Sequence, residues 1–273
     1  MSNMEVWKSE LLRSVRSLRS TDEVVFSSAD TVVEIGPPDT SEGRPAYNDP
    51  DYWDDRYAPS ITSKEGDESD AGNVSSGKGD DVYEWIVKYS DVKSRLAKFL
   101  DTTSYPAGLD VLHTGCGNST LGCDIRSDLA STGVRVVNCD YSSNVIDLMR
   151  GLYPSDDWEV LDCLGSAGEQ GVGEGYDRIV DKCVLDAFTC GGTEREKRDL
   201  VGKYLDFCLG CLRVGGRMIV VSFGQVETRG RYFKGETHGR KEEEWGWWWG
   251  GDFEVVDVEG GGKAYVYELC KKT

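Results

Sequence analysis

A regular alternation of strand-like and helix-like segments from residue 83 onward most constrains what this chain can fold into. Short apolar runs alternate with stretches whose apolar residues recur every three or four positions. The runs expected to form strands are 109–113, 134–139, 158–161, 176–180 and 218–222. Because strands separated by helices usually pair in parallel, the pattern predicts an α/β fold with a doubly wound, Rossmann-like sheet.

The C-terminal segment follows a different pattern. The runs 253–258 and 264–269 flank three consecutive glycines at 260–262, which indicates a β-hairpin. A hairpin adds antiparallel strands to the sheet edge, so we expect seven strands, mostly parallel, with an antiparallel C-terminal hairpin. The pair Gly215 and Gly216 is expected to end the helix before the fifth strand.

Two segments fall outside this alternation. Residues 1–46 begin with apolar residues at helical spacing and then become polar, so we expect an N-terminal extension that is partly helical or disordered. Residues 58–81 are rich in Ser, Gly, Asp, Glu and Lys, and we expect them to form a disordered insertion. The remainder predicts one folded domain over 47–273.

The overall composition limits the classes of partner. A formal net charge of −18 over 273 residues argues against binding nucleic acid and favours basic partners. No apolar stretch approaches the ~20 residues of a membrane helix, and no secretory signal is visible, so we expect a cytoplasmic protein without membrane association. Nine scattered cysteines suggest free thiols. With only two histidines we expect no metal site, although Cys208 and Cys211 form a CxxC.

Ligands of such sheets bind at the carboxyl ends of the strands, near the point where the strand order reverses. Gly115 and Gly117 follow the first strand and allow close approach to the backbone, although a simple tight turn would also use them. Asp140 follows the second strand, where a carboxylate can accept hydrogen bonds from ribose hydroxyls or cap a helix. Asp162 and Cys163 follow the third strand, within reach of an adenine.

The fourth predicted strand is followed by three ionisable residues, Asp181, Lys182 and Asp186. Charged groups at the end of a buried strand are unfavourable unless they are solvated or paired. An active-site mouth would supply both conditions. A surface ion pair between Asp181 and Lys182 is the alternative interpretation.

Several short motifs occur together in a specific order. They are Tyr-Trp-Asp-x-Arg-Tyr at 52–57, Tyr-x-Trp at 83–85, Gly-Cys-Gly-Asn-Ser at 115–119, Asp-Tyr-Ser-Ser at 140–143, Asp-Lys-x-x-Leu-Asp-Ala at 181–187, and Gly-Gly-Arg at 215–217 with Arg229, Arg231 and Tyr232. In this combination, over roughly residues 48–271, the chain resembles the class I, seven-strand methyltransferases related to the lysine methyltransferases of translation elongation factor 1-alpha.

The resemblance implies that residues 47–273 form an S-adenosylmethionine-dependent methyltransferase domain with a protein lysine as substrate, as in translation elongation factor 1-alpha. It also implies that aromatic side chains close over the cofactor. The cofactor-binding residues that it implies are Trp53, Tyr57, Trp85, Gly115, Asp140, Tyr141, Asp162, Cys163 and Lys182. Ordinary core packing is the alternative for Trp53 and Trp85. No dedicated general base is visible, so we expect Asp181 or Asp186 to orient the substrate amine.

Three features depart from the family pattern. His113 stands where many methyltransferases carry an acidic residue, so a hydrogen bond to the cofactor's amino group is altered or absent. Gly122 is expected to weaken the helix after the glycine turn by up to about 1 kcal/mol relative to Ala. The stretch 242–249, with four tryptophans, either lines a substrate groove or covers the sheet edge.

Other functions stay open at this point. A nicotinamide dehydrogenase shares the glycine turn and the strand-end acid, but Thr120 in place of the third glycine and the terminal hairpin argue against it. A methyltransferase acting on a small molecule or another protein fits the same residues. So does a non-catalytic, cofactor-binding module that binds a partner through an acidic surface. The sequence does not indicate an oligomeric state.

Overall fold

The computed structural model describes residues 47–58, 83–85, 87–104, 108–238, 244–258 and 262–272. The expected N-terminal extension at 1–46 lies outside the described residues, and so does nearly all of the expected insertion at 58–81. The expectations for these segments and for the domain boundary at 47 stay predictions.

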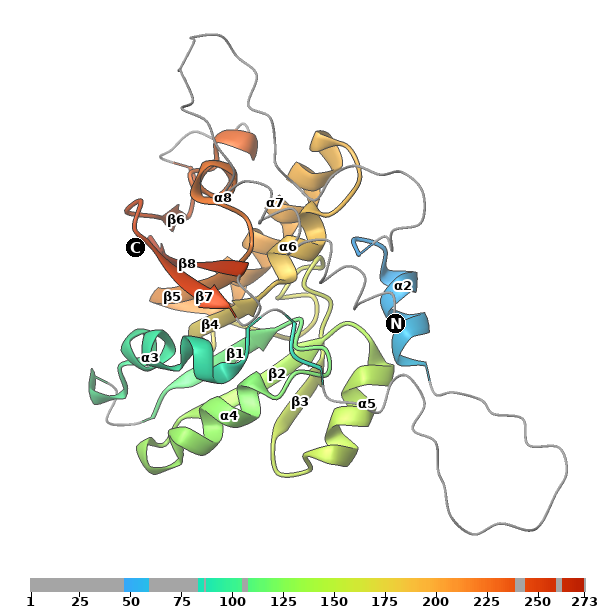
Figure 1. The fold of residues 1–273 in the computed structure, drawn as a ribbon, viewed down its shortest axis with the longest axis vertical. Coiled ribbons are helices and arrows are strands. Elements are labelled where there is room, and N and C mark those ends of the chain that lie inside the picture. The colour runs from blue at the N-terminus through green and yellow to red at the C-terminus, as the bar shows by residue number, and fades with distance from the viewer. Residues whose placement is uncertain are drawn as a thin grey trace, which may run out of the picture.

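A mostly parallel sheet forms the centre of the protein (Figure 1). Its strands are β1 (Asp110–Thr114), β2 (Arg135–Asp140), β3 (Asp157–Val160), β4 (Tyr176–Lys182), β5 (Leu212–Ser222), β6 (Trp247–Trp248), β7 (Phe253–Val258) and β8 (Gly262–Lys271). Their order is β3-β2-β1-β4-β5-β8, in which β1 to β5 are parallel and β8 is antiparallel to β5. The predicted α/β, Rossmann-like fold with an antiparallel C-terminal hairpin is confirmed.

The edge formed by β8 is more elaborate than the predicted seven strands. The outer side of β8 pairs with β7 along the hairpin and, nearer its end, with the two-residue β6 through Cys270 and Lys271. The sheet therefore has eight strands in the part of the chain that the structure describes.

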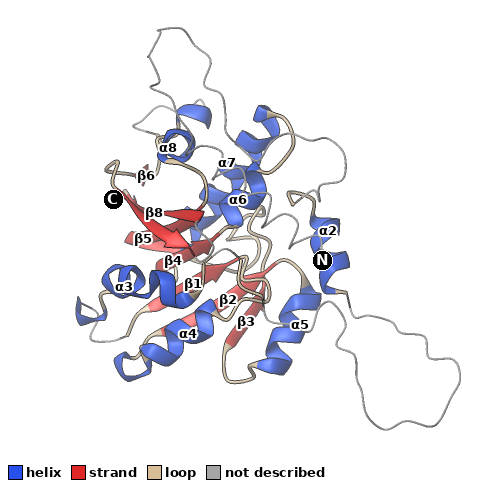
Figure 2. Ribbon diagram, in the orientation of Figure 1, coloured by secondary structure: helices blue, strands red, loops and turns tan. Residues whose placement is uncertain are grey.

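Helices flank the sheet (Figure 2). They are α2 (Pro50–Tyr57), α3 (Tyr89–Leu100), α4 (Leu121–Asp128), α5 (Ser143–Leu152), α6 (Val184–Thr189), α7 (Glu194–Cys211) and α8 (Val226–Phe233), with 3-10 turns at Thr102–Ser104, Ala130–Thr132 and Glu236–His238. The start of α7 is fixed by a capping box, in which Thr193 and Glu196 each satisfy the backbone N–H of the other.

The start of β5 differs from the expectation. The strand begins at Leu212 rather than at residue 218, and its register with β4 shifts between Tyr176 and Arg178. Gly215 lies in this irregular stretch with a φ of 75°, a left-handed conformation that favours glycine. The expected helix-ending role of Gly215 and Gly216 is therefore wrong: α7 already ends at Cys211, and the glycines lie in an irregularity of the strand.

The central strands are buried on both faces. Helices α3 and α4 pack on one face against side chains such as Val111 and Val136, and α7 and α8 pack on the other against Leu112 and Ile179. A strand covered on both sides needs apolar residues at successive positions. This explains why these strands appear in the sequence as continuous apolar runs.

The tryptophan-rich stretch covers the sheet edge where it is described. Trp245 and Trp247 are each 1% exposed, and their indole N–H groups donate to the carbonyls of Phe233 and Leu205 at 2.6 and 3.2 Å. Trp248, by contrast, is 57% exposed. Of the two hypotheses for this stretch, the buried tryptophans fit the covering of the edge.

Among the residues that the structure describes, no helix has the length and apolar character that a membrane span requires. No group of three or more His, Cys, Asp or Glu side chains in those ranges could hold a metal ion. The nine cysteines are free thiols, and Cys208 and Cys211 are buried at the end of α7.

Candidate active site

Polar side chains gather at the carboxyl ends of the parallel strands. Thr114 ends β1, Asp140 ends β2, Lys182 ends β4 and Ser222 ends β5, and all four are at least nine-tenths buried. After β3 the chain crosses to β4 on the other side of β1, so the strand order reverses between β1 and β4. This is the position at which open α/β sheets bind ligands.

The turn after β1 contains two glycines at positions where the neighbouring atoms leave no room for a side chain. Gly115 and Gly117 have φ values of 52° and 50°. A Cβ at Gly115 would lie 2.4 Å from a methyl carbon of Val184, and one at Gly117 would lie 2.8 Å from the hydroxyl of Tyr57. The turn therefore needs glycine both for its backbone conformation and for close packing against α6 and α2.

Among the described residues, backbone N–H groups hold the Asp140 carboxylate. Its Oδ2 accepts the N–H of Gly117 at 3.0 Å and its Oδ1 accepts the N–H of Ser142 at 3.1 Å. Ser142 occupies the N-cap position of α5 without a side-chain cap bond, and its buried hydroxyl has no hydrogen-bond partner among the described residues. Burial raises the pKa of Asp140 to about 6. The carboxylate is largely ionised at neutral pH and keeps acceptor capacity for a ligand.

The aromatic side chains from the N-terminal segment form one cluster over this turn. Trp53 stacks on Tyr57 with ring centroids 6.1 Å apart and meets Trp85 edge-on at 5.4 Å. The Trp53 indole N–H donates to the carbonyl of Tyr47 at 2.8 Å, and the Tyr47 ring lies 5.5 Å from Trp85. The structure thus brings together the three aromatic residues implied by the resemblance, and adds Tyr47.

Lys182 and Glu84 form a buried ion pair at 2.6 Å, with a side-chain exposure of only 2% for the lysine. Glu84 also accepts the hydroxyl of Ser119 and the backbone N–H of Thr120. Burial raises the pKa of Glu84, but Lys182 and these hydrogen bonds outweigh it and hold the pKa below its usual value. Glu84 therefore ties the segment 83–85 to the glycine turn and to the end of β4. This contact replaces the alternative pair of Lys182 with Asp181.

The residues after β2 and β3 lie nearer the surface. Tyr141 is partly buried, and its hydroxyl donates to the carbonyl of Pro50 in α2. Asp162 is exposed, and its Oδ1 accepts the N–H of Leu164 at 2.8 Å. Cys163 is buried next to the sheet at 7% exposure. Asp162 therefore lies beside the candidate site and is exposed to solvent.

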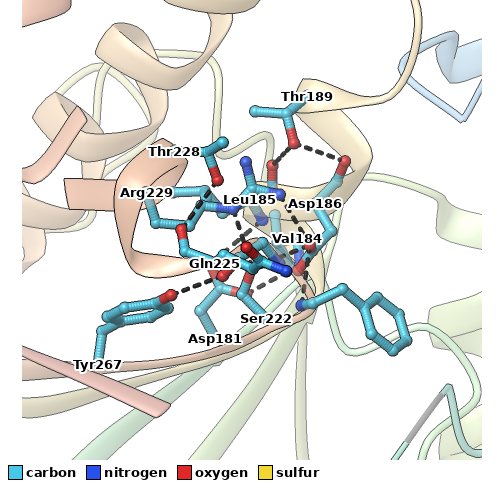
Figure 3. Close-up of polar contacts among 12 residues, drawn as sticks. Asp181, Val184, Leu185, Asp186, Thr189, Ser222, Gln225, Thr228, Arg229 and Tyr267 are labelled. Atoms are coloured by element: carbon cyan, nitrogen blue, oxygen red, sulfur yellow. Dashed lines mark hydrogen bonds and ion pairs between the residues drawn. The ribbon is translucent and has the colours of Figure 1, made fainter. Parts of the chain in front are cut away.

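Asp181 lies inside the protein, although it was expected to orient a substrate (Figure 3). It is 0% exposed. Its oxygens accept the N–H groups of Val184 and Leu185 at 2.8 and 3.3 Å. They also accept the hydroxyl of Tyr204 at 2.9 Å. Burial, together with the charge of Asp186, raises the pKa of Asp181 to about 7. In this arrangement Asp181 holds the start of α6.

Asp186 lies in the first turn of α6, next to the end of β5. One of its oxygens accepts the Ser222 hydroxyl and an Arg229 N–H, both at 2.9 Å. The structure thus brings Asp186 and Arg229 together across two elements. The amine-orienting roles of Asp181 and Asp186 stay predictions.

His113 and Gly122 are explained by one buried contact with Asn138 on β2. The Nδ1 of His113 lies 2.9 Å from the Asn138 side-chain oxygen, and burial lowers the pKa of His113 to about 4, so the ring is neutral. A Cβ at Gly122 would lie 1.8 Å from that same oxygen. Glycine is therefore required at position 122, where α4 packs on the sheet, although its low helix propensity destabilises the helix.

Several contributors to the site are missed by reasoning from the sequence. Ser222 could have been found, since it directly follows the apolar run of the fifth strand. Glu84 contacts Lys182 across 98 residues, and Tyr204 contacts Asp181 from the middle of α7. No spacing rule connects such positions.

Curated proteins are similar to this chain, while no protein-family model matches it. EEF1A lysine methyltransferase 4 of Mus musculus is 26% identical over 207 residues, which cover 73% of this chain and 70% of that protein. The Bos taurus protein of the same name is 27% identical over 157 residues, 56% of this chain, and the match spans about half, 51%, of its length. Among solved structures, TrmN from Thermus thermophilus has a TM-score of 0.47 at 19% identity, covering 65% of this chain and 47% of that one.

By its strand order and the residues at its strand ends, the chain resembles the class I S-adenosylmethionine-dependent methyltransferases. Within that class, its sequence is similar to the proteins named EEF1A lysine methyltransferase 4.

Proposed function

We propose that this protein is an S-adenosylmethionine-dependent methyltransferase that modifies a lysine side chain of a protein such as translation elongation factor 1-alpha. The observation that carries the proposal is the environment of Asp140. This buried carboxylate is anchored by backbone N–H groups, beside a glycine turn and close to an aromatic cluster. Such a carboxylate suits the two hydroxyls of a ribose.

The remaining residues fit the other parts of this cofactor. Asp162 and Cys163 follow β3, where an adenine would lie. The Lys182–Glu84 pair supplies one charge of each sign, as the amino-acid end of the cofactor requires. Trp53, Tyr57 and Trp85 would cover the bound molecule, with Gly115 and Tyr141 lining its two sides.

The bound cofactor supplies an electrophilic methyl group, so the protein must hold the amine in line with it and keep the amine neutral. A free lysine has a pKa of ~10.4, and neutralising it at pH 7 costs roughly 4.6 kcal/mol at ~1.36 kcal/mol per unit. Partial desolvation lowers that cost. Asp181 or Asp186 would orient the amine through a hydrogen bond.

Two observations support a basic protein as the substrate. The curated relatives carry the name of a lysine methyltransferase of EEF1A. The net charge of −18 favours the approach of a basic partner. A lysine on such a partner is the chemistry that both observations fit.

The test combines cofactor binding with methyl transfer. Titration calorimetry of the full chain with S-adenosylmethionine should give saturable binding, and tritiated cofactor should label purified elongation factor 1-alpha or a discrete protein band in a lysate. Asp140→Ala should strongly reduce the labelling at a cofactor concentration near the wild-type Kd. Asp147→Ala, which removes a carboxylate with 74% side-chain exposure on α5, is the matched control and should retain it.

The outcomes separate the alternatives. Absence of binding at ~1 mM cofactor would overturn the proposal. Binding without transfer to any protein would favour the non-catalytic module, and transfer to the small-molecule fraction of the lysate would favour the small-molecule enzyme.

A further inference from the structure

The two oxygens of the Asp186 carboxylate have different surroundings. Oδ1 accepts three hydrogen bonds, from the Ser222 hydroxyl at 2.9 Å, the Phe223 N–H at 3.1 Å and Arg229 Nη2 at 2.9 Å (Figure 3). Oδ2 is buried and accepts no hydrogen bond from the residues that the structure describes. A buried carboxylate oxygen without a hydrogen-bond donor is unfavourable. We therefore expect a donor that is not among the described contacts to bind this oxygen.

Arg229 is fixed in place by contacts that do not involve Asp186. Its side chain is 10% exposed, and its Nε donates to the Ser222 hydroxyl at 2.9 Å. A Cβ at Gly224 would lie 2.1 Å from this Nε, so the glycine makes room for the guanidinium. The Tyr267 hydroxyl donates to the Gly224 carbonyl at 2.6 Å and holds this turn from β8. The guanidinium is therefore held rigidly beside one oxygen of the carboxylate.

We propose that Asp186 binds the substrate amine through Oδ2, and that Arg229 is its positioning residue and offsets its charge. The proposal rests on the proposed methyltransferase function and assigns the amine contact to one of the two candidate carboxylates. Both oxygens of Asp181 already accept hydrogen bonds inside the protein, whereas one oxygen of Asp186 does not.

The pairing with Arg229 has a chemical consequence for the amine. A lone carboxylate favours the charged ammonium and raises its pKa, which opposes methyl transfer. A carboxylate and a guanidinium in an ion pair together carry little net charge, while the second carboxylate oxygen still accepts a hydrogen bond. The pair can therefore orient the amine without stabilising its unreactive form.

Other ionisable groups face this pair from every element packed against it. They are Asp181 on β4, Cys183 and Cys190 at the two ends of α6, Tyr232 on α8 and Tyr267 on β8, with Glu227 and Tyr265 next to Tyr267. All of them are present in each variant proposed below. A difference between variants therefore reports the Asp186–Arg229 pair.

The test measures kcat against pH for tritium transfer from S-adenosylmethionine to purified elongation factor 1-alpha. Arg229→Met removes the positive charge that offsets the Asp186 carboxylate. The rising limb of log kcat against pH should therefore shift to higher pH by about one unit, and kcat at a pH within this limb should fall about tenfold. Arg229→Lys keeps the charge and should restore the wild-type position. Asp186→Asn leaves Arg229 unpaired, so its limb should move to lower pH while KM rises.

Arg217→Met is the matched control. Arg217 forms a similar ion pair with Glu268 at 2.5 Å, but it lies five positions before Ser222 on β5, roughly 16 Å along the strand. Its pH profile should equal that of the wild type. Calorimetry with S-adenosylmethionine and a circular-dichroism melt check that each variant is folded and binds cofactor.

The results separate this inference from the function on which it rests. A wild-type chain that methylates no protein overturns both. An active wild type with unshifted limbs in Arg229→Met and Asp186→Asn overturns only the present inference. If Arg229→Met does not fold, the result for Asp186→Asn is used instead. A rising limb of log kcat that does not shift to lower pH in Asp186→Asn overturns the role of the pair.

Discussion

The carboxylates on the two halves of the candidate site are anchored differently. After β2 and β3, the hydrogen bonds recorded for Asp140 and Asp162 come from backbone N–H groups. At the end of β4 and in α6, Asp181 and Asp186 also accept hydrogen bonds from side chains on other elements. A carboxylate anchored by backbone N–H groups keeps acceptor capacity for a ligand, whereas one anchored by distant side chains also holds the fold together. Changes after β2 and β3 should therefore alter cofactor affinity, and changes after β4 should alter stability first.

The largest loss of stability is expected from Asp181→Ala. The substitution leaves the N–H groups of Val184 and Leu185 without their acceptor. It also removes one partner of the buried Tyr204 hydroxyl, which keeps only Thr114 Oγ1 at 2.8 Å. Each unsatisfied donor costs about 1–3 kcal/mol, so we expect the free energy of unfolding to fall by about 3 kcal/mol or more. Urea unfolding measures it. A loss below ~1 kcal/mol would mean that water replaces the carboxylate and that the two halves do not differ in this way.

The next effect is expected at the ion pair that joins the aromatic segment to β4. Lys182→Met leaves Glu84, with 19% side-chain exposure, without its cation. Breaking a fully buried pair costs about 3–5 kcal/mol, and the partial exposure of Glu84 reduces this to about 2 kcal/mol. The double variant Lys182→Met with Glu84→Gln should recover part of the loss. A double-mutant cycle with no coupling energy would show that the two side chains act independently.

The same contrast explains how far the sequence could lead. Asp140 and Asp162 directly follow apolar runs, so a rule about strand ends finds them. The central parallel strands are recognisable for a related reason, since burial on both faces leaves a continuous apolar run. Local patterns thus carry the sheet and the half of the site that follows β2 and β3.

The other half depends on contacts between distant positions. Glu84 and Lys182 are 98 residues apart, and Asp186 and Arg229 are 43 apart. Asp181 appears in the sequence as a strand-end acid like Asp140, yet the Tyr204 hydroxyl and the start of α6 enclose it. Gly215 shows the same limit at the backbone level, because only the register with β4 distinguishes a helix end from an irregularity of a strand.

Asp140→Ala should have the opposite profile to Asp181→Ala. It removes a charged acceptor for the ribose hydroxyls, and a hydrogen bond to a charged group is worth about 1.5–3 kcal/mol. We expect the affinity for S-adenosylmethionine to fall by about 10–100-fold in calorimetry. The unfolding free energy should fall less than for Asp181→Ala, because no side-chain donor loses its partner. A larger stability loss than in Asp181→Ala would remove the distinction between the halves.

The pH dependence of cofactor affinity sharpens this test. Burial raises the pKa of Asp140 to about 6, so protons bind to its carboxylate as the pH falls through 6. A protonated carboxyl is a weaker acceptor, so the affinity should be constant above about pH 7 and should decrease below pH 6, up to tenfold per unit. Calorimetry from pH 5 to 8 measures it. Asp140→Asn has no titrating carboxyl at this position. If its cofactor affinity depends on pH as in the wild type, another group causes the pH dependence.

The smallest effect is expected at Asp162, on the same half as Asp140. Its side chain is exposed and accepts the Leu164 N–H, so solvent can replace much of what Asp162→Ala removes. We expect unfolding free energy within about 0.5 kcal/mol of the wild type and a cofactor affinity reduced about threefold. Parallel titrations of Asp162→Ala and Asp140→Ala measure the ratio. Equal losses of cofactor affinity would show that exposure to solvent does not weaken the contribution of a strand-end carboxylate to cofactor binding. Anchoring by backbone N–H groups would then determine that contribution.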